Sequence, residues 1–427
     1  MKLSKPQKLV YDMQKIAEGS IGNICGSILF DKEYSVDELQ NALCEIVRLN
    51  DALRIRIKEM DGEIHQCVDD YVPLIFDILS FSDRKELEAY CKRFARKPID
   101  MSGVLYRFFI VKIGERVGVI CKIHHLIGDA WTLSLIGTQI NMLLNGETPG
   151  AYSYLDYITG EDDYRQSKRF EKDRIFFEEQ FKKCDEATYL NEKHSESYTA
   201  ERLTYTVNAA DTAKMTEYAN KKGVSVFSLL LAAFSVYVSR VKMNAEKFYI
   251  GTAVLNRGSA KEKNTMGMFI NTVPVLIEFD NSLSFVENLS RVSDNTFAVL
   301  RHQKYNYGDF LEYLREKYHF SEKLYDVIIS YQNAKVLGGG VETTWYSNGM
   351  QTESLQMHID DRDGEGILKI NYDYLTEKFT SHEIEMLHAH LFHLLFDAME
   401  NEKSNAGYKV FCSETYRCRA YASQGYV

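Results

Sequence analysis

The chain has 427 residues, of which 45% are hydrophobic and only 5 are prolines, so it is long and apolar enough to form a well-packed protein of two lobes. Its formal net charge of −10, without a basic run, argues against nucleic acid and anionic membrane surfaces as partners. The 8 cysteines are scattered without a Cys-x-x-Cys pair, which favours reduced thiols of the cytoplasm over a disulfide framework or a zinc site.

Helices and strands alternate in the first part of the chain. Hydrophobic periodicity and turn residues predict a helix over 3–19, a strand over 23–30, an amphipathic helix over 36–50, a hairpin over 53–68 that turns at Asp61-Gly62, a charged helix over 83–96 and a second hairpin over 105–123 that turns at Gly114-Glu115. Residues 117–123 are apolar and β-branched enough to form a buried strand.

The next segment, His-His-Leu-Ile-Gly-Asp from His124 to Asp129, precedes a helix predicted from Ala130 onward. Histidine titrates near neutral pH, where an acid-base catalyst works best, and a strand-to-helix turn often exposes reactive groups. Asp129 is well placed to cap the helix. By itself the pattern fits two interpretations about equally well: a catalytic site, or hydrogen-bonded structural histidines beside a capping aspartate.

A polar stretch over 145–199, with a charged helix over 163–184, divides the two halves. We place the lobe boundary near residue 175, which gives an N-terminal lobe of 1–175 and a C-terminal lobe of 176–427 with a linker or tail from about 405. The apolar run 224–238 is too short to span a bilayer and is interpreted as a buried helix capped by Ser225. The second lobe is further predicted to contain a strand at 203, a helix from 211, strands at 248 and 271, and a hairpin around 363–364.

A metal site is not favoured. His388, His390 and His393 share one predicted helix, but the sequence has no His-Glu-x-x-His string or cysteine ligand to accompany them. We interpret the helix as structural and expect no bound metal.

Several stretches together resemble condensation domains of nonribosomal peptide synthetases, which belong to the chloramphenicol-acetyltransferase-like superfamily. The string His124-His125-x-x-x-Asp129-Ala130-Trp131-Thr132 resembles the core motif of that family, with Ala130 where the family usually has glycine. Weaker similarities follow in the family's order, at 4–9, 49–56, 154–157, 250–253 with 256–257, 266–272, 302–303 and 325–327.

The resemblance implies both a fold and a reaction. The implied fold is α/β, with α+β two-layer sandwiches: two chloramphenicol-acetyltransferase-like lobes form a V-shaped pseudo-dimer with the active site in the cleft. The implied reaction forms an amide between a carrier-bound peptidyl or fatty acyl thioester and the amine of a carrier-bound aminoacyl thioester. Two alternatives stay open: a free-standing acyltransferase that uses coenzyme A or carrier thioesters, and a non-catalytic relative that recruits partners.

The resemblance also implies roles for single residues. His125 is implied to lie nearest the reacting atoms, as a general base or as a group that orients the amine and stabilises the oxyanion, while His124 fixes the loop. We expect Asp129 to pair with an arginine, with Arg54 as the best candidate, and Gly128 to support the turn. The block around Asn271 is expected to help form a channel through the lobe interface, with His125 near its middle.

The expected partners follow from the same resemblance. No cofactor is expected to bind this domain, because the donor arrives already activated as a thioester on the phosphopantetheine of a carrier protein, or on coenzyme A for a starter domain. Donor and acceptor carrier domains and an adjacent adenylation domain are the expected partners of a cytoplasmic monomer. Since Met1 lies just before the opening motif, the chain is also a candidate for a starter domain that acylates the first amino acid.

Overall fold

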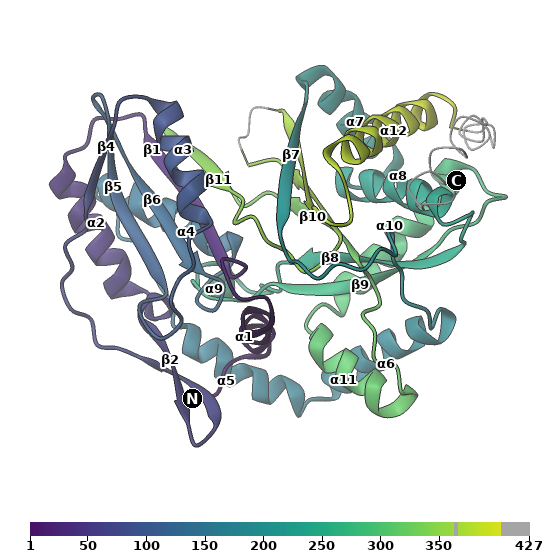
Figure 1. The fold of residues 1–427 in the computed structure, drawn as a ribbon, viewed down its shortest axis with the longest axis horizontal. Coiled ribbons are helices and arrows are strands. Elements are labelled where there is room, and N and C mark those ends of the chain that lie inside the picture. Colours follow the sequence, from purple (N-terminus) through teal and green to yellow (C-terminus); the bar gives the residue numbers. More distant parts are fainter. Residues whose placement is uncertain (363–365, 403–427) are drawn as a thin grey trace.

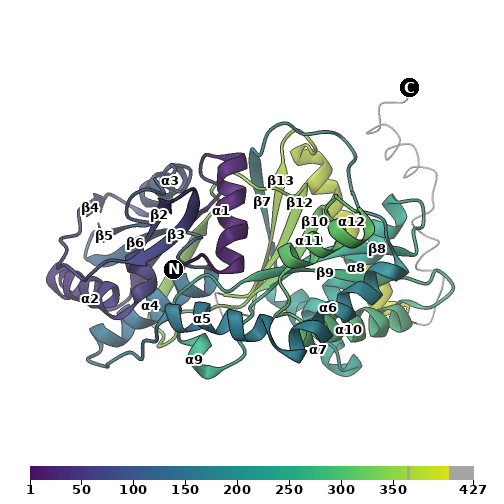
Figure 2. The same cartoon turned by 90° about the horizontal axis from the view of Figure 1, so that it is seen from below.

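The computed structural model describes residues 1–362 and 366–402. Its strands form two main sheets and a separate hairpin. The five-stranded sheet has the order β11 (Val341–Tyr346), β1 (Asn23–Phe30), β6 (Arg116–His124), β5 (Tyr106–Ile113) and β4 (Ile78–Phe81). The six-stranded sheet has the order β7 (Ala200–Val207), β13 (Leu368–Leu375), β12 (Leu355–Asp360), β10 (Val327–Gln332), β8 (Lys247–Val254) and β9 (Asn271–Glu278). Figures 1 and 2 show the two sheets side by side.

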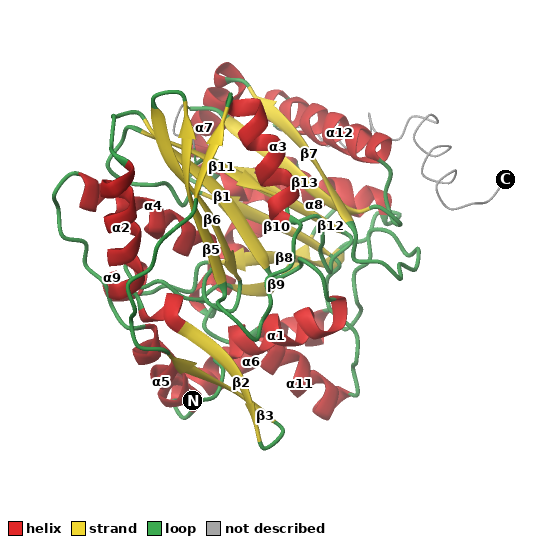
Figure 3. Ribbon diagram, turned by 60° about the vertical axis from the view of Figure 1, so that its left-hand side comes forward, coloured by secondary structure: helices red, strands yellow, loops and turns green. Residues whose placement is uncertain are grey.

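Helices accompany each sheet. The first half of the chain contains α1 (Lys5–Ala17), α2 (Val36–Leu49), α3 (Arg84–Ala95), α4 (Ala130–Leu144) and α5 (Tyr154–Arg165). The second half contains α6 (Lys168–Lys183), α7 (Ala209–Lys222), α8 (Val226–Val241), α9 (Ala260–Lys263), α10 (Phe285–Arg301), α11 (Tyr307–Tyr318) and α12 (Ser381–Glu400). In Figure 3, α2 and α4 lie on one side of the paired sheets, and α8 and α12 on the other.

Local sequence explains where many of these elements begin and end. Ser4, Ser35 and Ser225 each cap the helix that follows, through a side-chain oxygen that accepts a backbone N–H. The hairpin of β2 (Ile55–Met60) and β3 (Glu63–Val68) turns at Asp61-Gly62, where both residues have positive φ as a tight turn requires. These elements confirm the corresponding predictions. The charged helix predicted over 163–184 is instead two helices, because Ser167 caps α6 and interrupts the run.

Three apolar clusters hold the layers together. In the first half, α2 and α4 cover one face of the five-stranded sheet and α3 covers the other. In the second half, α6, α7, α8, α10, α11 and α12 share one large core with the six-stranded sheet. The boundary predicted near residue 175 falls within α6, whose Phe177 and Phe181 pack into that second core. The hairpin turn at 363–364 and the tail from 405 lie outside the described residues.

Chain crossings tie the two halves together. Strand β11 belongs to the second half of the sequence but pairs antiparallel with β1, from Cys25 opposite Tyr346 to Phe30 opposite Val341. Residues 255–270, which we call the crossover segment, reach in the same direction: Met266, Met268 and Phe269 are buried in the core of the first half. Sequence analysis predicted neither crossing.

One helix pair has some features of a membrane segment. No single helix in the described part of the chain is long and apolar enough to cross a bilayer. The pair α7 and α8, bent by 97°, satisfies the length and composition limits together.

Candidate active site

The His124–Asp129 motif forms a short turn between β6 and α4. Strand β6 ends at His124, and α4 begins at Ala130 with Asp129 as its N-cap; the carboxylate of Asp129 accepts the backbone N–H of Thr132 at 2.9 Å. The predicted cap is therefore confirmed. Because Ala130 is the first helical residue, the missing glycine costs no strain at that position. The backbone N–H of His125 donates to the carbonyl of Gly22 at 2.7 Å, which fixes the turn to the loop before β1.

His124 is fully buried and fastened on both ring nitrogens. Its Nδ1 accepts the backbone N–H of Leu126 at 3.1 Å, so in the neutral ring the proton is on Nε2, which donates to Gln14 Oε1 of α1 at 3.2 Å. Burial, with the neighbouring His125, lowers the pKa of His124 to about 3. The backbone at Gly22 passes so close that a Cβ there would lie 2.4 Å from His124 Nε2. These contacts suit a residue that positions the turn.

His125 differs from its neighbour. The residue is partly buried, and its buried Nδ1 has no hydrogen-bond partner among the described residues. Burial lowers the pKa of His125, and the negative charge of Asp129 opposes this shift in part. A ring with a lowered pKa stays neutral near pH 7 and can accept a proton.

The arginine that pairs with Asp129 is Arg257, and both side chains are 0% exposed. Arg257 Nη2 lies 2.9 Å from each carboxylate oxygen of Asp129. The same carboxylate accepts the backbone N–H of Phe269 at 3.2 Å, and the guanidinium lies 3.8 Å from the centre of the Phe269 ring. Arg257 also donates through Nη1 to the carbonyls of Glu262 and Thr265. The aspartate therefore joins the turn to the crossover segment.

The prediction that Arg54 pairs with Asp129 is wrong. Arg54 ends a short 3₁₀ turn (Asp51–Arg54) before β2, and its guanidinium donates to the carbonyls of Val47 and Asp69 at 3.2 and 2.7 Å. Its donors thus hold the base of the β2–β3 hairpin. Arg257 lies in a stretch whose resemblance was noticed, but its separation of 128 residues from Asp129 gave no local signal of contact.

The crossover segment packs closely beneath the turn. Thr132 Oγ1 donates to the carbonyl of Gly267 and accepts its N–H, at 3.0 and 3.1 Å. Trp131 Nε1 donates to the carbonyl of Lys263 at 2.8 Å, and Tyr154 Oη donates to the carbonyl of Met268 at 2.6 Å. A Cβ at Gly267 would lie 2.1 Å from the ring of Tyr154, so the close approach requires glycine.

The other two supporting residues have structural contacts. A Cβ at Gly128 would lie 2.7 Å from both Ile123 and Thr132, so this glycine lets the turn pack against β6 and α4. Asn271 is buried, and its amide donates to the carbonyls of Gln303 and Tyr305 at 3.0 and 2.9 Å. The contacts of Asn271 hold the 303–307 loop; its part in a channel stays a prediction.

The arrangement is suited to proton transfer and positioning. His124 is hydrogen-bonded to α1 and Asp129 is paired with the crossover segment. His125, in contrast, has a ring nitrogen without a partner among the described residues. A neutral imidazole on a fixed turn can accept a proton from a bound nucleophile or orient it.

Comparisons with known proteins give a consistent result. The family model for the condensation domain matches residues 1–415. The chain is 28% identical over 447 residues to surfactin synthase subunit 1 of Bacillus subtilis (strain 168), and 23% identical over 411 residues to bacitracin synthase 3 of Bacillus licheniformis. These matches cover 99% and 93% of this chain, but the chain spans only 12% and 6% of the two relatives.

Solved structures agree on the fold. The condensation domain of monacolin K polyketide synthase superposes with a TM-score of 0.83 at 18% identity, over 95% of this chain and 98% of that one. The starter condensation domain of rhizomide synthetase, in complex with C8-CoA, superposes with a TM-score of 0.82 at 16% identity, over 94% and 95% of the two chains. These matches confirm the predicted chloramphenicol-acetyltransferase-like fold.

Proposed function

Because the chain belongs to the condensation-domain family, we propose that it joins a carrier-bound acyl thioester to the amine of a carrier-bound aminoacyl thioester. Condensation domains of nonribosomal peptide synthetases are acyltransferases that form amide bonds. The observation that carries the proposal is the fixed turn on which His125 keeps an unpartnered ring nitrogen within the described residues, while His124 and Asp129 are held by buried contacts.

The proposed reaction is aminolysis. The amine nitrogen attacks the thioester carbonyl, the C–N bond forms, the C–S bond breaks, and the carrier thiol leaves. The nitrogen must lose one proton and the departing sulfur must gain one. We assign this transfer to His125, whose neutral ring can receive the proton and return it. The same position also suits a group that orients the amine or stabilises the tetrahedral intermediate.

His124 and Asp129 are proposed as positioning residues. His124 donates to Gln14 and accepts from Leu126, so it couples the turn to α1. Asp129 receives Arg257 and caps α4, so it couples the turn to the crossover segment. Displacing either residue would move the His125 ring away from the reacting atoms.

The proposed partners are those of a synthetase module. Donor and acceptor carrier domains would present their substrates on phosphopantetheine, with an adenylation domain beside this one, in the cytoplasm and with one copy of the chain. A starter reaction would take its acyl group from coenzyme A. We also propose two lobes, 1–175 and 176–427, whose interface forms the channel to His125 beside the block of Asn271.

The proposal is tested by supplying both substrates. The purified chain is mixed with acyl and aminoacyl thioesters, and the amide product is measured by mass spectrometry against His125→Ala. We expect product with the wild-type chain and very little with the variant. If a folded wild-type chain forms no amide from any pair, or if His125→Ala forms as much as wild type, the proposed mechanism is wrong.

A further inference from the structure

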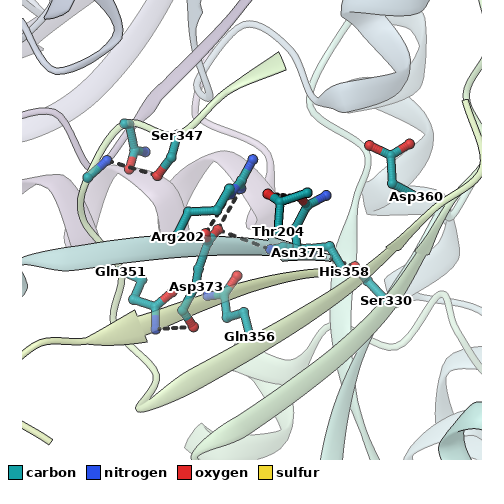
Figure 4. A network of polar contacts seen from close by, with 12 residues as sticks. Arg202, Thr204, Ser330, Ser347, Gln351, Gln356, His358, Asp360, Asn371 and Asp373 are labelled. Carbon is teal, nitrogen blue, oxygen red and sulfur yellow. Dashed lines mark hydrogen bonds and ion pairs between the residues drawn. The ribbon is translucent and has the colours of Figure 1, made fainter. Parts of the chain in front are cut away.

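One face of the six-stranded sheet carries polar side chains on four neighbouring strands. Successive residues of a strand point to opposite faces. On one face, Ile329, Met357 and Tyr372 pack into the core that the sheet shares with α8 and α12. On the opposite face lie the residues that we call the polar face: Arg202, Thr204, Ser330, Gln356, His358, Asn371 and Asp373 (Figure 4).

Strand register arranges these residues in two rows. Ser330 of β10 is opposite His358 of β12, which is opposite Asn371 of β13, which in turn is opposite Thr204 of β7. In the neighbouring row, Gln356, Asp373 and Arg202 are opposite one another across the same three strands, β12, β13 and β7. The polar face is therefore a continuous surface built on a rigid sheet.

Hydrogen bonds link the members of the polar face. Ser330 Oγ lies 2.7 Å from His358 Nδ1, and His358 Nε2 lies 3.4 Å from Asp373 Oδ2. Arg202 donates two bonds to the carboxylate of Asp373, each of 2.6 Å. Although burial opposes it, Arg202 keeps the pKa of Asp373 below its ordinary value. The network is thus preorganised and its opposite charges are paired.

The serine, histidine and aspartate are spaced like a hydrolytic triad, but their setting argues against nucleophilic attack. Ser330 is only 2% exposed and lies inside β10, which pairs with β12 and β8. An acyl-enzyme would also need N–H donors that converge on the developing oxyanion, as a turn or a helix N-terminus provides. Strand interiors use their backbone N–H groups for pairing instead.

Part of the polar face is exposed, and hydrogen bonds connect it to the loop that holds the turn of His125. The side chains of Arg202, His358 and Asp373 are 25%, 16% and 13% exposed, and Thr204 at the β7 edge is exposed. Gln351 donates to the carbonyl of Asp373 at 3.0 Å. Three residues earlier in the chain, an asparagine donates to two carbonyls of the loop at 20–23, the loop that also accepts the His125 backbone N–H.

The exposed hydroxyl of the polar face retains hydrogen-bonding capacity for a ligand. The Thr204 hydroxyl donates its proton to Asn371 Oδ1 at 2.7 Å and keeps lone pairs that can accept another donor. An aliphatic chain laid on such a surface would displace water without replacing its hydrogen bonds, which is unfavourable. A chain with amide or hydroxyl groups would replace them.

We propose that the polar face binds the acyl group of the condensation reaction and selects acyl groups that bear amide or hydroxyl groups over plain aliphatic ones. This inference rests on the proposed function and gives it a substrate class. It excludes an unsubstituted fatty acyl chain as the preferred donor.

A pair of acyl groups of the same shape tests the preference. N-acetylglycyl and 4-methylpentanoyl thioesters share one heavy-atom skeleton, but only the first carries an amide. With a fixed aminoacyl acceptor, we expect kcat/KM for N-acetylglycyl to exceed that for 4-methylpentanoyl by about tenfold, the effect of one well-placed hydrogen bond. In the Thr204→Val variant, the preference should fall to about twofold or less. Thr216→Val, which removes a hydroxyl that bonds within α7, should leave it unchanged.

A binding measurement separates this inference from the proposed function. Amide-linked analogues of the two acyl groups are titrated into the wild-type and Thr204→Val chains by calorimetry. If amide products form but neither kcat/KM nor affinity favours the N-acetylglycyl group, the polar-face proposal is overturned and the proposed function stands. If no amide forms but the affinity preference exists and is lost in the Thr204→Val variant, the polar face is supported and the proposed function fails. A preference that survives in the Thr204→Val variant also overturns the polar-face proposal.

Discussion

Two aspartate–arginine pairs lie beside histidines in this molecule, and they differ in burial and in what they join. Asp129 and Arg257 are both 0% exposed and connect a turn of the first half to the crossover segment. In the second pair Asp373 is buried and Arg202 is partly exposed, and the two connect neighbouring strands of one sheet. The first pair holds two distant parts of the chain together, whereas the second lies within one face of a sheet.

The histidines beside these two pairs, His125 and His358, differ as well. His125 has an unpartnered Nδ1 within the described residues, while His358 contacts Ser330 through Nδ1 and Asp373 through Nε2. A histidine whose ring nitrogens are both engaged is held in place, and one with an unpartnered nitrogen can exchange a proton with a bound substrate. The proposed reacting histidine therefore differs from the histidine of the proposed binding surface in whether its ring nitrogens already have hydrogen-bond partners.

The largest expected effect is the loss of amide formation in His125→Ala, which tests whether His125 is the reacting group. Amide formation should fall by roughly 10²–10⁴-fold, the usual worth of a general acid-base group. The fold should survive, because the ring is partly exposed and its Nδ1 bonds no described residue. Product is measured by mass spectrometry and folding by thermal denaturation. His382→Ala, at an exposed position of α12, is the control. A folded His125→Ala chain with wild-type turnover would remove His125 from the reaction.

Asp129→Ala tests the buried pair. Removing one partner leaves an uncompensated buried charge, so the free energy of unfolding should fall by about 3–5 kcal/mol, and activity should fall with it. Asp373→Ala should cost less stability than Asp129→Ala, because the arginine it leaves unpaired, Arg202, is partly exposed to water, whereas Arg257 is not. Denaturant unfolding of both variants, and of Arg257→Ala alone and combined with Asp129→Ala, measures the coupling. An unchanged melting temperature for Asp129→Ala would show that this pair does not stabilise the fold.

Gly267→Ala tests whether the crossover segment must lie close to α5. A Cβ at this position would meet the Tyr154 ring at 2.1 Å, so we expect a loss of about 1–3 kcal/mol in the free energy of unfolding. Gly160→Ala is a matched control in α5, where the added Cβ meets nothing within 4 Å and should stabilise the helix by about 0.5–1 kcal/mol. Denaturant unfolding compares the two. Equal effects would mean that the close approach at Gly267 is unimportant.

The smallest expected effect concerns pH. The pKa of His124 is about 3 in the folded chain and about 6.5 when unfolded, so the unfolded state binds the extra proton. The contribution of His124 to stability is therefore complete above pH 6.5 and is lost as pH falls toward 3, by about 1 kcal/mol per pH unit. We expect His124→Asn to lose less stability than wild type between pH 7 and pH 5 in denaturant titrations. Parallel pH profiles would contradict the buried neutral state of His124.

Individual strands, helices and caps could be predicted from the sequence because the residues that cause them lie close together in the chain. The strand at Asn23–Phe30 and the helix capped by Ser225 follow from hydrophobic periodicity and a capping side chain. The same holds for Asp129, whose cap on α4 was predicted. The break between α5 and α6 was missed, although Ser167, a residue type that commonly caps helices, is visible within the charged run.

Contacts between segments far apart in the chain could not be predicted from such local patterns. Arg54 and Arg257 carry the same charge, so either could pair with Asp129 as far as the sequence shows. Arg257 reaches Asp129 because residues 255–270 cross to the start of α4. Strand β11 pairs with β1 across more than 300 residues. The alternation of Leu355–Asp360 (Leu-Gln-Met-His-Ile-Asp) does indicate a half-buried strand, but its partners on β10 and β13 depend on sheet order.

The two chain crossings into the first half bear on how this protein can be engineered. The first half takes material from the second half of the sequence: β11 completes one edge of the first sheet, and Met266, Met268 and Phe269 fill the core beside it. A fragment cut at residue 175 would expose an unpaired strand edge and an incompletely filled interior, both of which promote aggregation. Chimaeras that recombine lobes from different synthetases therefore need to transplant β11 and residues 255–270 together with the N-terminal half.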